Sequence, residues 1–151
     1  MCKLGDIIII KEFKDEDGTL VSKHSFVVVN DESNSIQGLN YDFVSNMMCS
    51  FHDEEHKNKK LNYKQNVLVD RSNVHGDNIN SKEGYIKANR LYYFEKSKID
   101  YKVIAHIDDQ LLSKLLKIIV SLYNEKKVEL VTTNLWIILT NLFINIIIII
   151  N

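Results

Sequence analysis

The sequence predicts an α+β domain, mainly β, in which short antiparallel strands form a barrel or sandwich and one helix follows. Three observations lead to this class. Apolar, β-rich runs such as 7–13, 26–29 and 41–51 alternate with polar turn clusters. The connections between these runs are too short for the crossover helices that parallel strands require. Only the segment 108–123 has apolar residues recurring at helical spacing.

The first half of the chain is expected to be three strands separated by turns. A turn cluster at 15–19 follows the strand 7–13 and contains Gly18, the residue best able to adopt a positive φ. A second cluster at 30–35 ends the almost wholly apolar strand 26–29. The long strand 41–51 follows, and we expect it and the first strand to meet the 26–29 strand.

The second half is expected to contain shorter strands and the helix. A charged, solvated loop is predicted from 52 to 64, and a polar loop from 70 to 83. Asp108 is a good N-cap for a helix that should end near Tyr123 and cover the barrel. A helical turn is predicted at 89–91, and 92–94 should pair with 101–105. The short strands are expected at 66–69, 84–88, 92–94, 101–105 and 126–133.

The length and composition favour one domain, which we place at residues 1–134. The chain has 151 residues, 45% hydrophobic and 26% charged, as in a globular protein. The tail, 135–151, is apolar and of low complexity, and five consecutive isoleucines precede Asn151. A membrane-spanning helix needs ~20 apolar residues. We therefore expect this tail to be neither an anchor nor part of the functional core, and membrane binding to be absent.

Charge and cysteine content limit the classes of function. The net charge of −1 means that nucleic-acid binding would require a local basic patch. Cys2 and Cys49 lie far apart and indicate neither a disulfide framework nor a zinc site. The start of the chain shows no leader pattern. A cytoplasmic protein without metal or cofactor is the expectation.

Four side chains are of the types that cleave RNA without a metal. Lys23 can stabilise charge on a phosphate, and Ser50 can position one. His24 and His52 can transfer protons near neutral pH. These residue types at these spacings are also common at solvated strand ends and turns, so the pattern alone leaves both interpretations open.

A basic segment is the candidate RNA-binding region. Between His56 and Arg71 there are five basic side chains against one acidic one. Cations with an aromatic ring are typical of single-stranded RNA binding, although a solubilising loop has the same composition. The candidate RNA-binding residues are Lys57, Lys59, Lys60, Tyr63 and Lys64.

Short motifs in a fixed order resemble a known group of toxins. They are Gly5-Asp6-Ile7, Lys23-His24-Ser25-Phe26-Val27-Val28, Tyr41-Asp42-Phe43-Val44, Ser50-Phe51, Lys59-Lys60-Leu61, Gly84-Tyr85-Ile86-Lys87 and Tyr92-Tyr93-Phe94. Their order is similar to that of the PemK/MazF/Kid superfamily of toxin endoribonucleases. The closer resemblance is to the CptN-like toxins of type III toxin–antitoxin systems, relatives of ToxN and AbiQ. It extends to about residue 135.

The resemblance implies an SH3-like (PemK/MazF-type) antiparallel barrel with a C-terminal helix. It further implies metal-independent cleavage of single-stranded RNA to 2′,3′-cyclic phosphate and 5′-hydroxyl ends. The partners would be cellular RNA and an antitoxin, a repeat-derived, pseudoknot-like RNA that the toxin itself processes. The family's basic catalytic position falls on Lys23, beside His24, and its hydroxyl position falls on Ser50. His52 falls near a later basic position of the family.

Two other functions fit the same sequence. One is a type II toxin of the same fold, an mRNA interferase neutralised by a protein antitoxin. The other is a non-catalytic SH3-like module that binds RNA through the same basic segment and leaves it intact.

Overall fold

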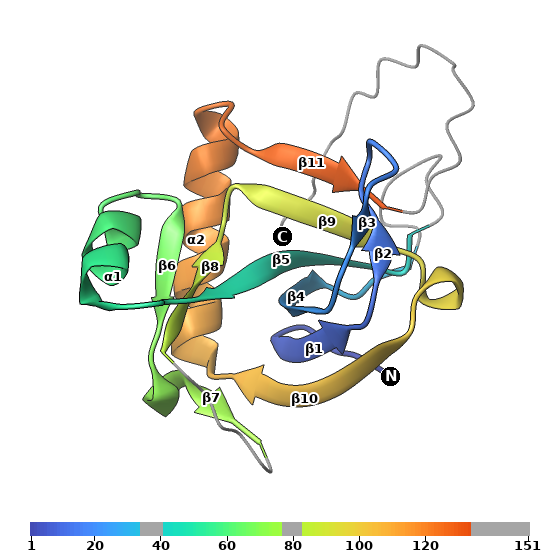
Figure 1. Cartoon of the computed structure of the whole chain (residues 1–151), viewed down its shortest axis with the longest axis horizontal. Helices are drawn as coiled ribbons and strands as arrows, with labels where there is room; N and C mark the ends of the chain where they lie inside the picture. Colours follow the sequence, from blue (N-terminus) through green and yellow to red (C-terminus); the bar gives the residue numbers. More distant parts are fainter. Residues whose placement is uncertain (34–40, 77–82, 134–151) are drawn as a thin grey trace.

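The computed structural model describes residues 1–33, 41–76 and 83–133 (Figure 1). Its strands are β1 (Asp6–Ile10), β2 (Phe13–Lys14), β3 (Leu20–Val21), β4 (His24–Asn30), β5 (Phe43–Ser50), β6 (Asn66–Val69), β7 (Val74–His75), β8 (Gly84–Lys87), β9 (Arg90–Phe94), β10 (Tyr101–Ile107) and β11 (Glu129–Thr132). Its α-helices are α1 (Glu54–Leu61) and α2 (Asp109–Asn124), and single 3-10 turns are η1 (Arg71–Asn73) and η2 (Lys96–Lys98). The predicted α+β, mainly β class is confirmed.

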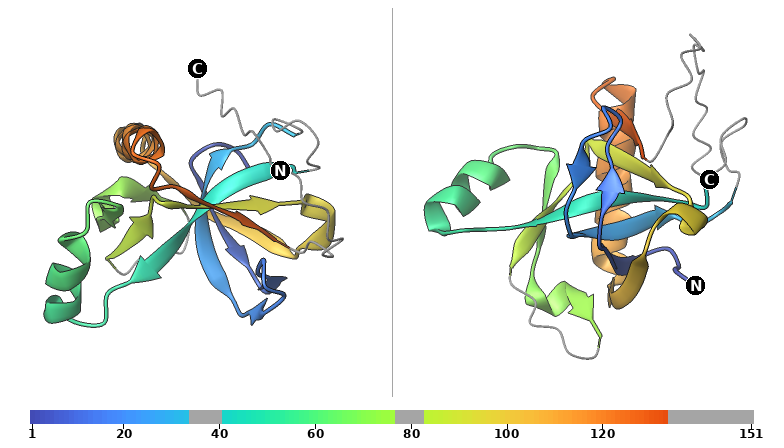
Figure 2. Two further views of the ribbon diagram at one scale, coloured as in Figure 1. Left: turned by 90° about the horizontal axis from the view of Figure 1, so that it is seen from above. Right: turned by 45° about the vertical axis from the view of Figure 1, so that its right-hand side comes forward.

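One large sheet forms the body of the molecule. Its strands follow the order β11-β9-β5-β4-β1-β10-β7, and β8 pairs with both β5 and β6. Every pair in it is antiparallel except β11 with β9, which is parallel. The sheet curls strongly into a half-barrel, and the small hairpin of β2 and β3 lies over it (Figures 1 and 2).

Strand β4 lies in the middle of this sheet. It pairs with β1 through Ile8 opposite Phe26, and with β5 through Phe26 opposite Met47. Its central residues Phe26, Val27 and Val28 are buried. The three segments that the sequence predicted to meet therefore do meet, as adjacent strands.

The two faces of the sheet have separate cores, as the two-residue period of a strand requires. On the face that we call the hairpin face, Phe13 contacts Phe26 and Phe94 edge to face, with ring centroids 5.7 and 5.4 Å apart. On the opposite face, which we call the helix face, Val27 belongs to the core that α2 completes. Successive side chains of β4 and β5 therefore point alternately to the hairpin face and to the helix face.

Helix α2 follows the prediction closely. The Asp108 carboxylate accepts a hydrogen bond from the Leu111 backbone N–H at 2.7 Å, which caps the first turn. The helix buries one apolar stripe against the helix face, formed by Leu111, Leu112, Leu115, Ile119 and Leu122. None of the helices in the described ranges is long and apolar enough to cross a membrane. The tail at 135–151 lies outside the described residues.

Three local predictions were wrong. The predicted loop at 52–64 contains helix α1, which starts at an Asp53 side chain that accepts from the His56 N–H at 2.7 Å. Because α1 buries none of its residues, no apolar stripe marks it in the sequence. Residues 89–91 are not helical; Asn89 lies in a tight turn that joins β8 to β9. Finally, β9 pairs with β5 and β11 rather than with β10, which lies between β1 and β7.

We predict that Gly84→Ala destabilises the fold by about 1–3 kcal/mol, because a Cβ there would lie 2.4 Å from the Cys49 carbonyl oxygen. Denaturant unfolding followed by circular dichroism measures this loss. Gly18→Asn is the control, because Gly18 has φ +82° with nothing near a Cβ and Asn tolerates that conformation. Equal midpoints for Gly84→Ala and the wild type would contradict the tight β5–β8 contact.

Candidate functional site

Three of the four predicted catalytic residues lie at adjoining strand ends. The β4–β5 register pairs Ser25 with Met48. That pair ends the ladder: His24 and Cys49 come next, and Lys23, which precedes β4, and Ser50 follow them. Lys23 and Ser50 are exposed and His24 is half-buried. A cation, an imidazole and a hydroxyl thus lie within two residues of the end of the β4–β5 ladder.

The His24 ring is held in one tautomer. Its Nδ1 lies 2.7 Å from the Ser22 carbonyl oxygen. A carbonyl oxygen can only accept, so Nδ1 carries the proton and donates it. In the neutral form of this ring Nε2 has a free lone pair, which is what a general base needs.

Alternation along the strands separates the side chains at this end. The same register places His24 across from Cys49, on the hairpin face with Phe26. Ser50 follows Cys49 in β5 and therefore points to the opposite face. A phosphate that contacted both His24 and Ser50 would have to lie beyond the end of the ladder, between the two faces.

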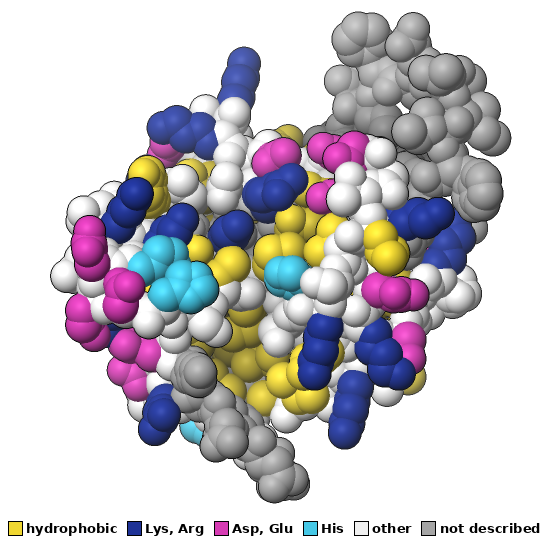
Figure 3. All heavy atoms as spheres, viewed as in Figure 1, with side chains coloured by type: hydrophobic (Ala, Val, Ile, Leu, Met, Phe, Trp, Pro, Cys, Tyr) yellow, Lys and Arg dark blue, Asp and Glu magenta, His cyan; other side chains and the backbone are white. Residues whose placement is uncertain are grey.

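His52 lies in a different group. Its ring centroid is 4.7 Å from that of His56, and its backbone N–H donates to His56 Nδ1 at 3.4 Å. Figure 3 shows histidine side chains beside one another over the end of β5 and α1, and a separate histidine nearer β4. The structure thus groups Lys23, His24 and Ser50 at the ladder end and places His52 at the start of α1.

The predicted RNA-binding residues are distributed over α1 and the turn after it. Lys57 donates to both carboxylate oxygens of Glu83, at 2.8 and 2.7 Å, and this bond raises the Lys57 pKa above its ordinary value. Lys59 and Lys60 lie in the last turn of α1, which projects from the side of the sheet (Figure 2). Tyr63 is 47% exposed. This projecting helix is the basic part of the predicted region.

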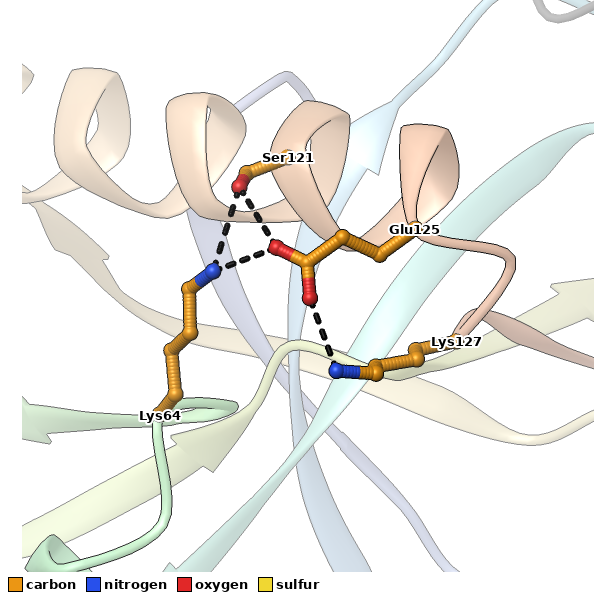
Figure 4. A network of polar contacts seen from close by, with 4 residues as sticks. All are labelled: Lys64, Ser121, Glu125 and Lys127. Atoms are coloured by element: carbon orange, nitrogen blue, oxygen red, sulfur yellow. Dashed lines mark hydrogen bonds and ion pairs between the residues drawn. The ribbon is translucent and has the colours of Figure 1, made fainter.

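Lys64 belongs to a structural network instead (Figure 4). Its ammonium group contacts the Glu125 carboxylate and lies 3.5 Å from the Ser121 hydroxyl, both at the end of α2. Lys127 donates to the other oxygen of Glu125 at 2.8 Å. The two lysines lower the pKa of Glu125 to about 2. Lys64 therefore ties the turn before β6 to α2, and Glu125 offsets part of its charge.

Sequence reasoning did not find Asn46, a buried polar residue of β5 that holds the turn between two other strands. Asn46 is fully buried in β5, and its amide donates to the backbone oxygens of Lys87 at 2.9 Å and Arg90 at 2.7 Å. It therefore fixes the β8–β9 turn. Arg90 in turn pairs with Glu129 at 2.8 Å and lies over the Tyr92 ring at 5.5 Å. An Asn in the middle of a mostly apolar strand was the available signal.

A metal centre has no support in the part of the chain that the structure describes. Among residues 1–33, 41–76 and 83–133, no three His, Cys, Asp or Glu side chains are arranged to hold a metal ion. Comparison of the chain with protein-family models, curated proteins and solved structures gave no match. Any functional assignment therefore depends on the residues at the ladder end and on the sequence motifs.

We predict that the Glu125 network stabilises the fold in a pH-dependent way. The pKa of Glu125 is about 2, against an ordinary value of 4.5, so its contribution is present above pH 4.5 and is lost as the pH falls towards 2. Glu125→Gln removes the titrating group. The difference in unfolding free energy between wild type and variant should shrink across this window, as followed by denaturant unfolding at several pH values. A pH-independent difference would contradict the network.

Proposed function

We propose that this protein is a metal-independent endoribonuclease and the toxin of a type III toxin–antitoxin system, with an SH3-like (PemK/MazF-type) fold. The observation that supports this most strongly is the position of Lys23, His24 and Ser50, all within two residues of the end of the β4–β5 ladder. Lys23 and His24 come from one motif of the resemblance and Ser50 from another. In the sequence, Ser50 follows His24 by 26 positions and Lys23 by 27. Their residue types are those that metal-free RNA cleavage requires.

The proposed reaction is an internal transfer at one phosphate. His24 Nε2 takes the proton of the ribose 2′-hydroxyl, and the 2′ oxygen forms a bond to phosphorus. Lys23 stabilises the charge on the pentavalent phosphorane, and Ser50 holds a non-bridging oxygen. The bond from phosphorus to the 5′ oxygen breaks, and that oxygen takes a proton; His52 is the proposed donor, because it follows Ser50 by only two residues although it packs against His56. The products are a 2′,3′-cyclic phosphate and a 5′-hydroxyl.

The proposed partners are RNAs. Lys59 and Lys60 in the last turn of α1 provide positive charge on the segment that follows β5, where a single strand leaving the site would pass, whereas the charge of Lys57 is offset by Glu83. The same surface would hold the antitoxin, a repeat-derived RNA that the toxin has cut into units. Tandem repeats next to the gene would agree with an RNA antitoxin, and a small open reading frame would favour the protein-antitoxin alternative.

The central prediction is cleavage of long single-stranded RNA by the purified protein in EDTA. We expect cyclic phosphate ends, identified by mass spectrometry. Lys23→Ala and Ser50→Ala should each lower the cleavage rate by about 10²–10³-fold, because each removes stabilisation of the transition state. Lys114→Ala is the matched control, since Lys114 is an exposed lysine of α2. Intact RNA with the wild-type protein would favour the non-catalytic module.

The roles of the two histidines can be separated with a modified substrate. His24→Ala and His52→Ala should both slow cleavage, by about 10²–10⁴-fold. A substrate with sulfur in place of the scissile 5′ oxygen has a leaving group that needs no proton. It should restore the rate of His52→Ala and leave His24→Ala slow. Equal rescue of both variants, or of neither, would contradict the assignment of base and acid.

A further inference from the structure

A group of aromatic rings extends outward from the sheet where β5 ends. Phe51 stacks on Tyr85 of β8, with ring centroids 5.3 Å apart and planes inclined by 25°. The His56 ring of α1 is inclined by 70° to that of Phe51, with ring centroids 6.3 Å apart, and the His52 and His56 centroids are 4.7 Å apart. We call Phe51, His52, His56 and Tyr85 the ring cluster.

Exposure increases along the ring cluster. Tyr85 is only 3% exposed, and its burial raises the pKa of its hydroxyl to about 12. Phe51 and His56 are half-buried, and His52 is exposed. Tyr85 thus belongs to the body of the protein, while Phe51 and His56 present ring surface to solvent. An aromatic ring kept partly in water, beside a helix that buries nothing, is a feature that core packing does not require.

The ring cluster lies on the same face of the sheet as His24. Cys49 pairs with Tyr85 across β5 and β8, and the β4–β5 register places His24 across from Cys49 on its other side. Strands lie about 5 Å apart, so the backbones of His24 and Tyr85 are roughly 10 Å apart. A short stretch of single strand is long enough to connect the two positions.

A hydrogen-bond donor in the ring cluster fits a nucleobase. The helix that carries His56 has Glu54 and Glu55 in its first turn and Lys59 and Lys60 in its last, so its positive charge lies at the far end from His52. His56 Nδ1 accepts the His52 N–H, so His56 Nε2 carries a proton that it can donate to an acceptor on a base edge. Only an unpaired base exposes both a ring face and its edge, because pairing and stacking hide them in a duplex.

We propose that Phe51 and His56 form a stacking site for one unpaired nucleobase of single-stranded RNA. The base belongs to a nucleotide next to the phosphate held at Lys23 and His24, and this second statement rests on the proposed function. Stacking itself requires no cleavage. The site selects single strands over duplexes and adds base preference through His56 Nε2.

The test uses a single-stranded oligonucleotide with 2′-O-methyl groups, which cannot be cut because the attacking hydroxyl is blocked. Fluorescence anisotropy measures its affinity for the full chain. Phe51→Leu should weaken binding about tenfold, since stacking on an aromatic ring contributes about 1–3 kcal/mol per base. Phe51→Trp should retain the affinity. Tyr123→Leu, which removes a 42% exposed ring of α2, is the matched control and should bind like the wild type.

The outcomes separate this site from the proposed function. Equal affinity of Phe51→Leu and wild type, with both proteins folded by circular dichroism, would overturn the stacking site, as would an equal loss of duplex binding. No binding of the oligonucleotide by wild type would overturn it too. A tenfold loss in Phe51→Leu supports the site even if the wild type leaves unmodified RNA intact in EDTA, and that result would remove only the ribonuclease assignment.

Discussion

The pairing of β4 on both of its edges is the constraint on which the rest of the structure depends. Ile8 and Met47 lie on either side of Phe26, and the buried residues of β4 contribute to both cores. A shift of one residue in this register would exchange the two faces and place Phe26 in the helix-face core. The same register ends at Ser25 and Met48, within two residues of Lys23 and Ser50. Stability and the candidate site therefore depend on a single alignment.

The Gly-Asp-Ile motif near the N-terminus has a structural role in this alignment. Gly5 has φ +83°, and a Cβ there would lie 2.7 Å from the His106 ring. The Asp6 carboxylate contacts His106 Nδ1 at 3.1 Å and accepts from the Lys3 N–H at 2.7 Å. The motif thus fixes the start of β1 against β10. The residues of this motif therefore hold the sheet together, whereas Lys23 and Ser50 are exposed at the surface.

Helix α1 has a different physical basis from α2. It is capped by Asp53, with Glu54 and Glu55 in its first turn and Lys59 and Lys60 in its last, an arrangement that favours the helix dipole. Its links to the body are polar and aromatic, through Lys57 to Glu83 and through His56 to the ring cluster. A helix held in this way leaves its charge and rings at the surface, which is what binding to RNA would use.

The sequence by itself determined the strands and helix whose signals are local. The apolar run of β4, the turn at Gly18 and the Asp108 cap of α2 were predicted because neighbouring residues decide them. The meeting of β1, β4 and β5 was also predicted, but only the tertiary structure decided the partners of β9 and β10, that α1 is a helix, and which lysines are engaged. Lys57 meets Glu83 and Lys64 meets Glu125 across 26 and 61 positions of sequence. Such contacts depend on which distant segments the curled sheet brings together, and a pattern of neighbouring residues does not predict this.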